Sequence, residues 1–141
     1  MANLRTAYLK HDQVPARAAL QEAIQSLRFK LTLDESYAPF ECAGYIPCTL
    51  DGEDAGFEIK FAEIEFSTLA PELKSAIGEC DSAIQIRSGA DPREIVSAMI
   101  VAATLTKSFS ALIHNQGEAS FQDAEALFNA ARSAFSALSE F

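Results

Sequence analysis

Apolar and charged residues alternate from residue 57 to residue 61, and a second apolar arm, residues 44–50, precedes them. Between the arms lies the acidic turn formed by residues 51–54, which contains an Asp-Gly pair. Period-two alternation is typical of a half-buried strand, and Asp-Gly between two such arms favours a tight hairpin turn. Residues 44–61 therefore predict a β-hairpin with one apolar face, one charged face and several carboxylates at its tip.

The same alternation predicts two further strands, at residues 29–33 and 83–87, and residues 111–114 suit a third, short strand. Residues 29–33 also suit the extended end of a helix, although strand is favoured, and residues 111–114 could continue the helix before them. The Asn-Gln-Gly sequence that follows residue 114 favours a strand that ends in a turn.

The first arm of the hairpin is expected to begin at Phe40, and Pro47 should end it or place it at a sheet edge. The second arm is expected to continue to Phe66. Its apolar phase changes at Phe61 and Ala62, which is the pattern that a β-bulge produces.

Apolar residues at helical spacing predict an amphipathic helix over residues 14–27, with Pro15 in its first turn. Residues 68–77 suit a short helical turn closed by Gly78. Asp91 followed by Pro92 marks a helix start, and the helix after it is apolar nearly all round, so we expect it to lie centrally across the sheet. A last helix is expected over residues 120–138, and Ser120 with Asp123 resembles its capping box.

These elements predict one α+β domain over residues 1–141, with a mainly antiparallel sheet of about four to five strands and helices packed on one face. The other face should be open to water or to a partner. It would display Glu58, Lys60, Tyr45 and Glu41.

The net charge of −9 is concentrated in one part of the chain. Residues 34–65 contain nine acidic residues and one basic residue, Lys60, whereas basic residues predominate in the first 33 positions. Such a chain is a poor candidate for binding nucleic acid or an anionic membrane and suits a cationic partner. The acidic tip could also be no more than a solvated turn.

Neither a signal peptide nor a membrane span is apparent, since residues 95–105, the most apolar stretch, are too few to cross a bilayer. Cys42, Cys48 and Cys80 form no close pair and are expected to be reduced, mostly buried thiols. A cytoplasmic location fits both observations.

No nucleotide-binding or nucleophile motif occurs in the sequence. His11 and His114 are expected at the surface, and the acidic turn lacks the ligand spacing of a calcium loop. Glu58 and Glu63 could act as a carboxylate pair only if a bulge placed them on one face. We therefore expect no catalytic residues, no metal site and no cofactor.

The sequence Gly-Tyr-Ile-Pro-Cys-Thr-Leu-Asp-Gly-Glu-Asp-Ala-Gly-Phe-Glu, residues 44–58, resembles a signature of small immunity proteins from bacterial polymorphic-toxin, type VI and contact-dependent secretion systems. In them a Gly-aromatic-x-Pro-Cys segment leads through an acidic turn to Ala-Gly-Phe-Glu. Residues 111–118 and the helix after them resemble the strand, turn and helix that end those proteins, although the family often has Asp where this chain has Asn115.

The resemblance implies a non-catalytic protein that binds a cognate toxin, expected to be cationic, and occludes its active site or its access to substrate. The candidate contact residues are Tyr45, Asp51, Glu53, Asp54 and Glu58, with Tyr45 as a possible aromatic anchor. Two alternatives are a secretion chaperone or adaptor that holds an effector segment and a small carboxylate-dependent enzyme.

Overall fold

The computed structural model describes residues 3–64, 71–115 and 121–138. These residues form a six-stranded antiparallel sheet in the order β2-β3-β4-β5-β1-β6. The α+β class and the antiparallel sheet are thereby confirmed, with a strand count slightly above the predicted four to five.

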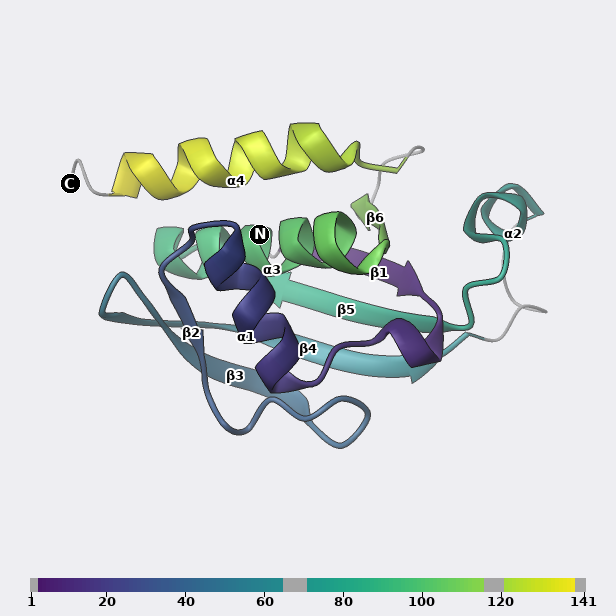
Figure 1. Cartoon of the computed structure of the whole chain (residues 1–141), viewed down its shortest axis with the longest axis horizontal. Coiled ribbons are helices and arrows are strands. Elements are labelled where there is room, and N and C mark those ends of the chain that lie inside the picture. The colour runs from purple at the N-terminus through teal and green to yellow at the C-terminus, as the bar shows by residue number, and fades with distance from the viewer. Residues whose placement is uncertain (1–2, 65–70, 116–120, 139–141) are drawn as a thin grey trace.

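Figure 1 shows the strands and helices in place. The strands are β1 (Asn3–Leu9), β2 (Leu31–Leu33), β3 (Ala43–Leu50), β4 (Glu53–Glu63), β5 (Ser82–Ser88) and β6 (Leu112–Asn115). The helices are α1 (Arg17–Ser26), α2 (Pro71–Ile77), α3 (Pro92–Phe109) and α4 (Ala124–Leu138), with a short 3-10 turn, η1, at His11–Gln13.

The hairpin formed by β3 and β4 agrees with its prediction. Asp51 and Gly52 have φ values of 52° and 81°, and Leu50 pairs with Glu53 across them. Two consecutive positive φ angles define a type I′ turn, whose twist matches that of the flanking strands. The Asp51 N–H also donates to the Lys30 carbonyl at 2.7 Å, which joins the turn to the start of β2.

Pro47 lies inside β3, so the prediction that it ends the strand was wrong and the prediction of an edge position is confirmed. β2 pairs only with Cys48, Thr49 and Leu50, which leaves β3 at the edge of the sheet from Pro47 back to its first residue. The Pro47 carbonyl accepts from Asp34 N–H at 3.3 Å on that side, so the N–H that proline lacks would point outward.

No bulge interrupts β4 where it pairs with β5, and that prediction was wrong. The register runs without a break from Glu58 opposite Arg87 to Glu63 opposite Ser82. Phe61 keeps the phase of the preceding apolar residues and packs against the core. Phe66 lies outside the described residues.

Strand β1 is absent from the sequence-based prediction although it lies between β5 and β6. Of its inward-facing side chains, only Ala7 and Leu9 are apolar and fully buried. Arg5 and Thr6 interrupt the apolar pattern, so the strand is recognisable mainly from its long-range partners.

The helices begin later than predicted at both ends of the chain. Residue Ala16 is extended (φ −70°, ψ 167°), so α1 starts at Arg17 and Pro15 precedes it. Helix α4 starts at Ala124, and the Asp123 carboxylate caps it by accepting from Ala126 N–H at 3.0 Å. The proposed capping partner Ser120 lies outside the described residues.

The central position of α3 is confirmed. The Asp91 carboxylate accepts from Arg93 N–H at 2.8 Å, and buried side chains occur along most of the helix. Helix α3 contacts β1, β3, β4, β5 and β6, while α1 packs beside it over β2. Helix α4 packs antiparallel against α3, and α2 lies at the far end of the molecule (Figure 1).

Arg132 fastens α4 to the end of α1. Its guanidinium donates to the carbonyls of Leu27 and Arg28 and lies 4.2 Å from the centroid of the Phe29 ring. Arg28 has a positive φ of 65°, which is unfavourable for a residue other than glycine. The hydrogen bonds from Arg132 hold the two carbonyls at the end of α1 in this turn.

Candidate functional site

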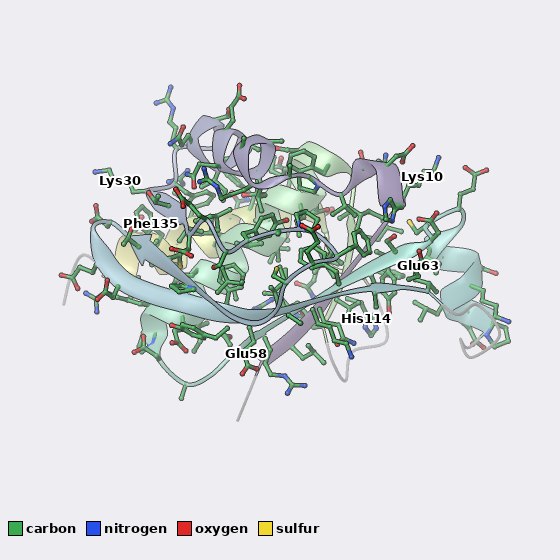
Figure 2. All side chains as sticks on the ribbon, turned by 90° about the horizontal axis from the view of Figure 1, so that it is seen from below. Lys10, Lys30, Glu58, Glu63, His114 and Phe135 are labelled. Carbon is green, nitrogen blue, oxygen red and sulfur yellow. The ribbon has the colours of Figure 1, made fainter. Side chains whose placement is uncertain are left out.

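The face of the sheet away from the helices, called the open face below, carries the residues that alternate with the core. Across it, Tyr45 pairs with Glu58, Glu58 with Arg87, and Arg87 with Leu4. Figure 2 shows Glu58 on this side of the sheet. Tyr45 and Glu58, both predicted contact residues, are therefore immediate neighbours.

The Tyr45 ring is fixed across the hairpin. Its hydroxyl donates to the Glu94 carboxylate at 3.0 Å and lies 3.2 Å from the Ala55 carbonyl. The ring lies over Gly56, where a Cβ would come within 2.2 Å of the Tyr45 hydroxyl. Glycine at this position is therefore required by the ring above it.

Tyr45 is nonetheless 52% exposed, the one large hydrophobic side chain with high exposure among the described residues. Loss of solvation, reinforced by the Glu94 carboxylate, raises the pKa of Tyr45 to about 12. The hydroxyl is thus neutral at physiological pH, and one face of a rigid aromatic ring is available for contact.

Asp51 and Glu53, by contrast, already have cationic neighbours. Asp51 lies 3.8 Å from the Lys30 ammonium, and Glu53 forms a 2.6 Å ion pair with Arg93 from α3. Both carboxylates line a cleft of about 460 Å³ that also includes Arg132 from α4. Their charges are largely balanced within the protein.

Asp54 and Glu58 differ from this pair because both are exposed and no ion pair of either occurs among the described residues. Asp54 lines a shallow depression of about 260 Å³ beside Pro47, and Asp34 lines the same depression. Hydrogen bonds from Ser36, side chain and backbone, hold the pKa of Asp34 below its usual range. Asp34 therefore adds a second carboxylate to this depression.

The open face as a whole is less acidic than the sequence suggested. Lys60 and Arg87 lie on it and line the same depression as Glu58, with a volume of about 380 Å³. Asp34 and Asp54, which form no ion pair among the described residues, lie instead near the outer edge of β3.

Asp34 belongs to the acidic segment of the sequence, residues 34–65. Its position beside Asp54 could not be predicted, because it depends on the path of the chain between β2 and β3.

The five predicted contact residues thus divide into two surfaces. Tyr45, Asp54 and Glu58 lie on the open face near the β3 edge, whereas Asp51 and Glu53 face the cleft beside α4. Glu94 and Gly56, which hold Tyr45 in place, were not predicted. Only the Gly56 position in the hairpin motif hinted at a close approach.

The cysteines form no disulfide. Cys48 is buried, and burial raises the pKa of its thiol to about 11, so it is a neutral core residue. Cys42 and Cys80 are only half-buried. Within the described ranges, no three His, Cys, Asp or Glu side chains come together in a group that could hold a metal ion.

In the part of the chain that the structure describes, no helix is long and apolar enough to cross a membrane. The fold is α+β, and none of the helices in residues 3–64, 71–115 and 121–138 covers the open face of the sheet. Comparison with protein families, curated proteins and solved structures finds no match for this chain.

Proposed function

We propose that this protein is a non-catalytic inhibitor that binds a cognate bacterial toxin and blocks its active site or its access to substrate. The hairpin motif, with its likeness to immunity proteins, supports the proposal. So does the arrangement of the motif: Gly52 and Gly56 shape the hairpin, while exposed carboxylates and one aromatic ring project from it.

The observation that carries the proposal is the position of Asp54 and Glu58 beside the fixed Tyr45 ring. Both carboxylates project from the same side of β4, because residues 54 and 58 are separated by an even number of positions. Charges held on a rigid strand steer a cationic partner into place, and a half-exposed aromatic ring supplies contact area with little loss of side-chain entropy.

The first experiment is co-expression. The chain is produced together with a toxin domain encoded beside its own gene, and growth of the host cells is followed. Growth restored by soluble inhibitor supports the proposal. A toxin that stays lethal in the presence of soluble, folded protein contradicts it.

Charge reversal then locates the contact surface. Asp54→Lys and Glu58→Lys should each lower the association rate about tenfold at low salt, because each reverses an exposed carboxylate that forms no ion pair among the described residues. Reversal of Asp51 and Glu53 should have a smaller effect on the rate, since Lys30 and Arg93 already balance them.

Glu72→Lys is the matched control, because Glu72 is an exposed acid on α2, remote from the hairpin. Rates come from surface plasmon resonance at two salt concentrations, and thermal unfolding checks that each variant is folded. Equal effects of Asp54→Lys and Glu72→Lys would mean that net charge alone matters and that the interface lies elsewhere.

A further inference from the structure

Strand β3 is longer than the strand that covers its outer side. β2 pairs only with Cys48, Thr49 and Leu50, whereas β3 begins at Ala43. Residues 43–47, called the edge segment below, therefore form an edge of the sheet. Ala43, Gly44 and Tyr45 are all exposed.

Alternate backbone groups of the edge segment point away from β4. The Pro47 carbonyl accepts from Asp34 N–H on the outer side, and backbone direction alternates along a strand. The N–H and C=O of Tyr45, two residues before Pro47, must therefore point outward too. Because the register with β4 is continuous, the same holds for Ala43. No described residue hydrogen-bonds to them there.

The two outer strands of the sheet, β2 and β6, are each partly paired on their outer sides. The Gln21 side chain in α1 hydrogen-bonds to the outer side of β2. Its Nε2 donates to the Leu31 carbonyl and its Oε1 accepts from Leu33 N–H, both at 2.7 Å. On β6, the Ile113 carbonyl accepts from Gln122 N–H at 2.8 Å. Unpaired edges invite strand addition, and the edge segment, unlike the outer sides of β2 and β6, has no such partner among the described residues and lies beside the acidic residues.

The loop between β2 and β3 leaves this edge accessible because it packs on the helix side of the sheet. The Tyr37 hydroxyl in this loop donates to the Pro15 carbonyl at 3.2 Å, and the Tyr37 ring packs against Phe61 of the inner face. Figure 2, which views the molecule from the β3 side, shows the loop on the same side of the sheet as the helices.

Charge determines which strand fits. Asp34, Glu35 and Glu41 lie exposed in the loop that joins β2 to β3, and Asp54 and Glu58 lie on the adjoining strand. A second copy of this chain, paired edge to edge, would bring the same acids together and be repelled. A basic segment would meet opposite charges.

We propose that the edge segment binds an extended, basic segment of a partner protein, which adds to the sheet as a seventh strand beside β3. Side chains of the added strand that point to the open face would lie beside Ala43 and the exposed Tyr45 ring. A segment that alternates basic and apolar residues therefore fits best. The identification of the partner as a toxin rests on the function proposed above. The binding of a basic strand at this edge does not depend on that function.

The probe is a peptide of eight residues in which Lys and Val alternate, and the readout is amide hydrogen exchange by NMR on the full chain. In the free protein the Tyr45 and Ala43 amides should exchange fast, and those of Gly44 and Ile46, which face β4, slowly. Saturating peptide should slow exchange at Tyr45 and Ala43 at least tenfold and leave Gly44 and Ile46 unchanged.

Two control peptides and two variants of the protein make the result decisive. The same peptide with every backbone nitrogen methylated has no N–H donors on either edge and cannot form the ladder, and a Glu-Val peptide reverses the charge, so neither should protect Tyr45. Ala43→Lys should weaken binding of the Lys-Val peptide at least fivefold, whereas Gln85→Lys, which adds the same charge to an exposed position in the centre of the open face, should change it less than twofold.

Absence of protection at Tyr45, or equal protection by the methylated peptide, overturns the proposal. So does protection of Tyr45 that depends on protein concentration without peptide, which would show pairing between two copies of the chain. Neutralisation of a toxin without protection of Tyr45 would contradict the edge proposal alone. Protection of Tyr45 by the peptide without neutralisation would contradict the inhibitor proposal alone.

Discussion

Substitution of Gly56 by Ala tests how the hairpin holds Tyr45. The added Cβ would lie 2.2 Å from the Tyr45 hydroxyl oxygen, 2.3 Å from Cζ and 2.8 Å from the Ile46 carbonyl oxygen. Contacts shorter than about 3 Å cannot persist, and the ring is the part that can move. It would then lose the hydrogen bond that its hydroxyl donates to the Glu94 carboxylate, and its close approach to the Ala55 carbonyl.

The expected cost follows from this hydrogen bond. A hydrogen bond to a charged group contributes about 1.5–3 kcal/mol, with the lower values appropriate to a half-exposed ring. Replacing Gly by Ala in a strand recovers about 0.5–1 kcal/mol of chain entropy. Gly56→Ala should therefore destabilise the protein by about 1–2 kcal/mol, which corresponds to a fall in Tm of about 2–8 °C.

A double-mutant cycle isolates the cause. Urea unfolding, followed by circular dichroism, is measured for Gly56→Ala, for Tyr45→Ala and for the double variant. If the clash with the ring causes the loss, Gly56→Ala should cost at least 1 kcal/mol less when Tyr45 is absent. An equal cost in both backgrounds, or no cost in either, would show that the ring does not make glycine necessary here.

Three further variants address other contacts. Gln21→Leu removes the amide that occupies the outer side of β2 and should cost about 1–2 kcal/mol and cause concentration-dependent association in light scattering, whereas Gln25→Leu, an exposed change one turn later, should do neither. Arg132→Lys keeps the charge but loses the planar group that bonds two carbonyls and stacks on an aromatic ring. It should cost about 1–3 kcal/mol in urea unfolding, and a cost near zero would mean that charge alone suffices. The pKa of Tyr45 rises from 10.0 to about 12 on folding, so its stabilising contribution is complete below pH 10 and is lost as the pH rises through 12. Tyr45→Phe should accordingly lose less stability than the parent protein over this range in urea titrations, and an identical loss would refute the assigned pKa.

The parts of the fold that could be predicted from the sequence are those specified by neighbouring residues. The hairpin depends on an Asp-Gly pair between alternating arms, and the start of α3 depends on Asp91 and Pro92, which act within one turn. Strand β1 could not be recognised in this way, because its burial comes from distant partners such as Ser82 and Asn115.

The candidate site was predictable in composition but not in arrangement. The acids of the hairpin were evident from the sequence, yet the pairing of Glu53 with Arg93 and of Tyr45 with Glu94 depends on where α3 crosses the sheet. Those tertiary contacts separate the carboxylates that are balanced within the protein from those that are exposed and unpaired, such as Asp54. No local pattern contains that information.

The position of β1 between β5 and β6 has a consequence for how the chain is made. Strands β2, β3 and β4 come from one contiguous stretch, Leu31 to Glu63, and can pair as soon as that stretch has left the ribosome. β1 is synthesised first but must wait for Ser82–Ser88 and then for Leu112–Asn115 before both its edges are paired. The half of the sheet that contains the hairpin can thus form early, and closure of the other half sets the time at which the newly made protein becomes complete.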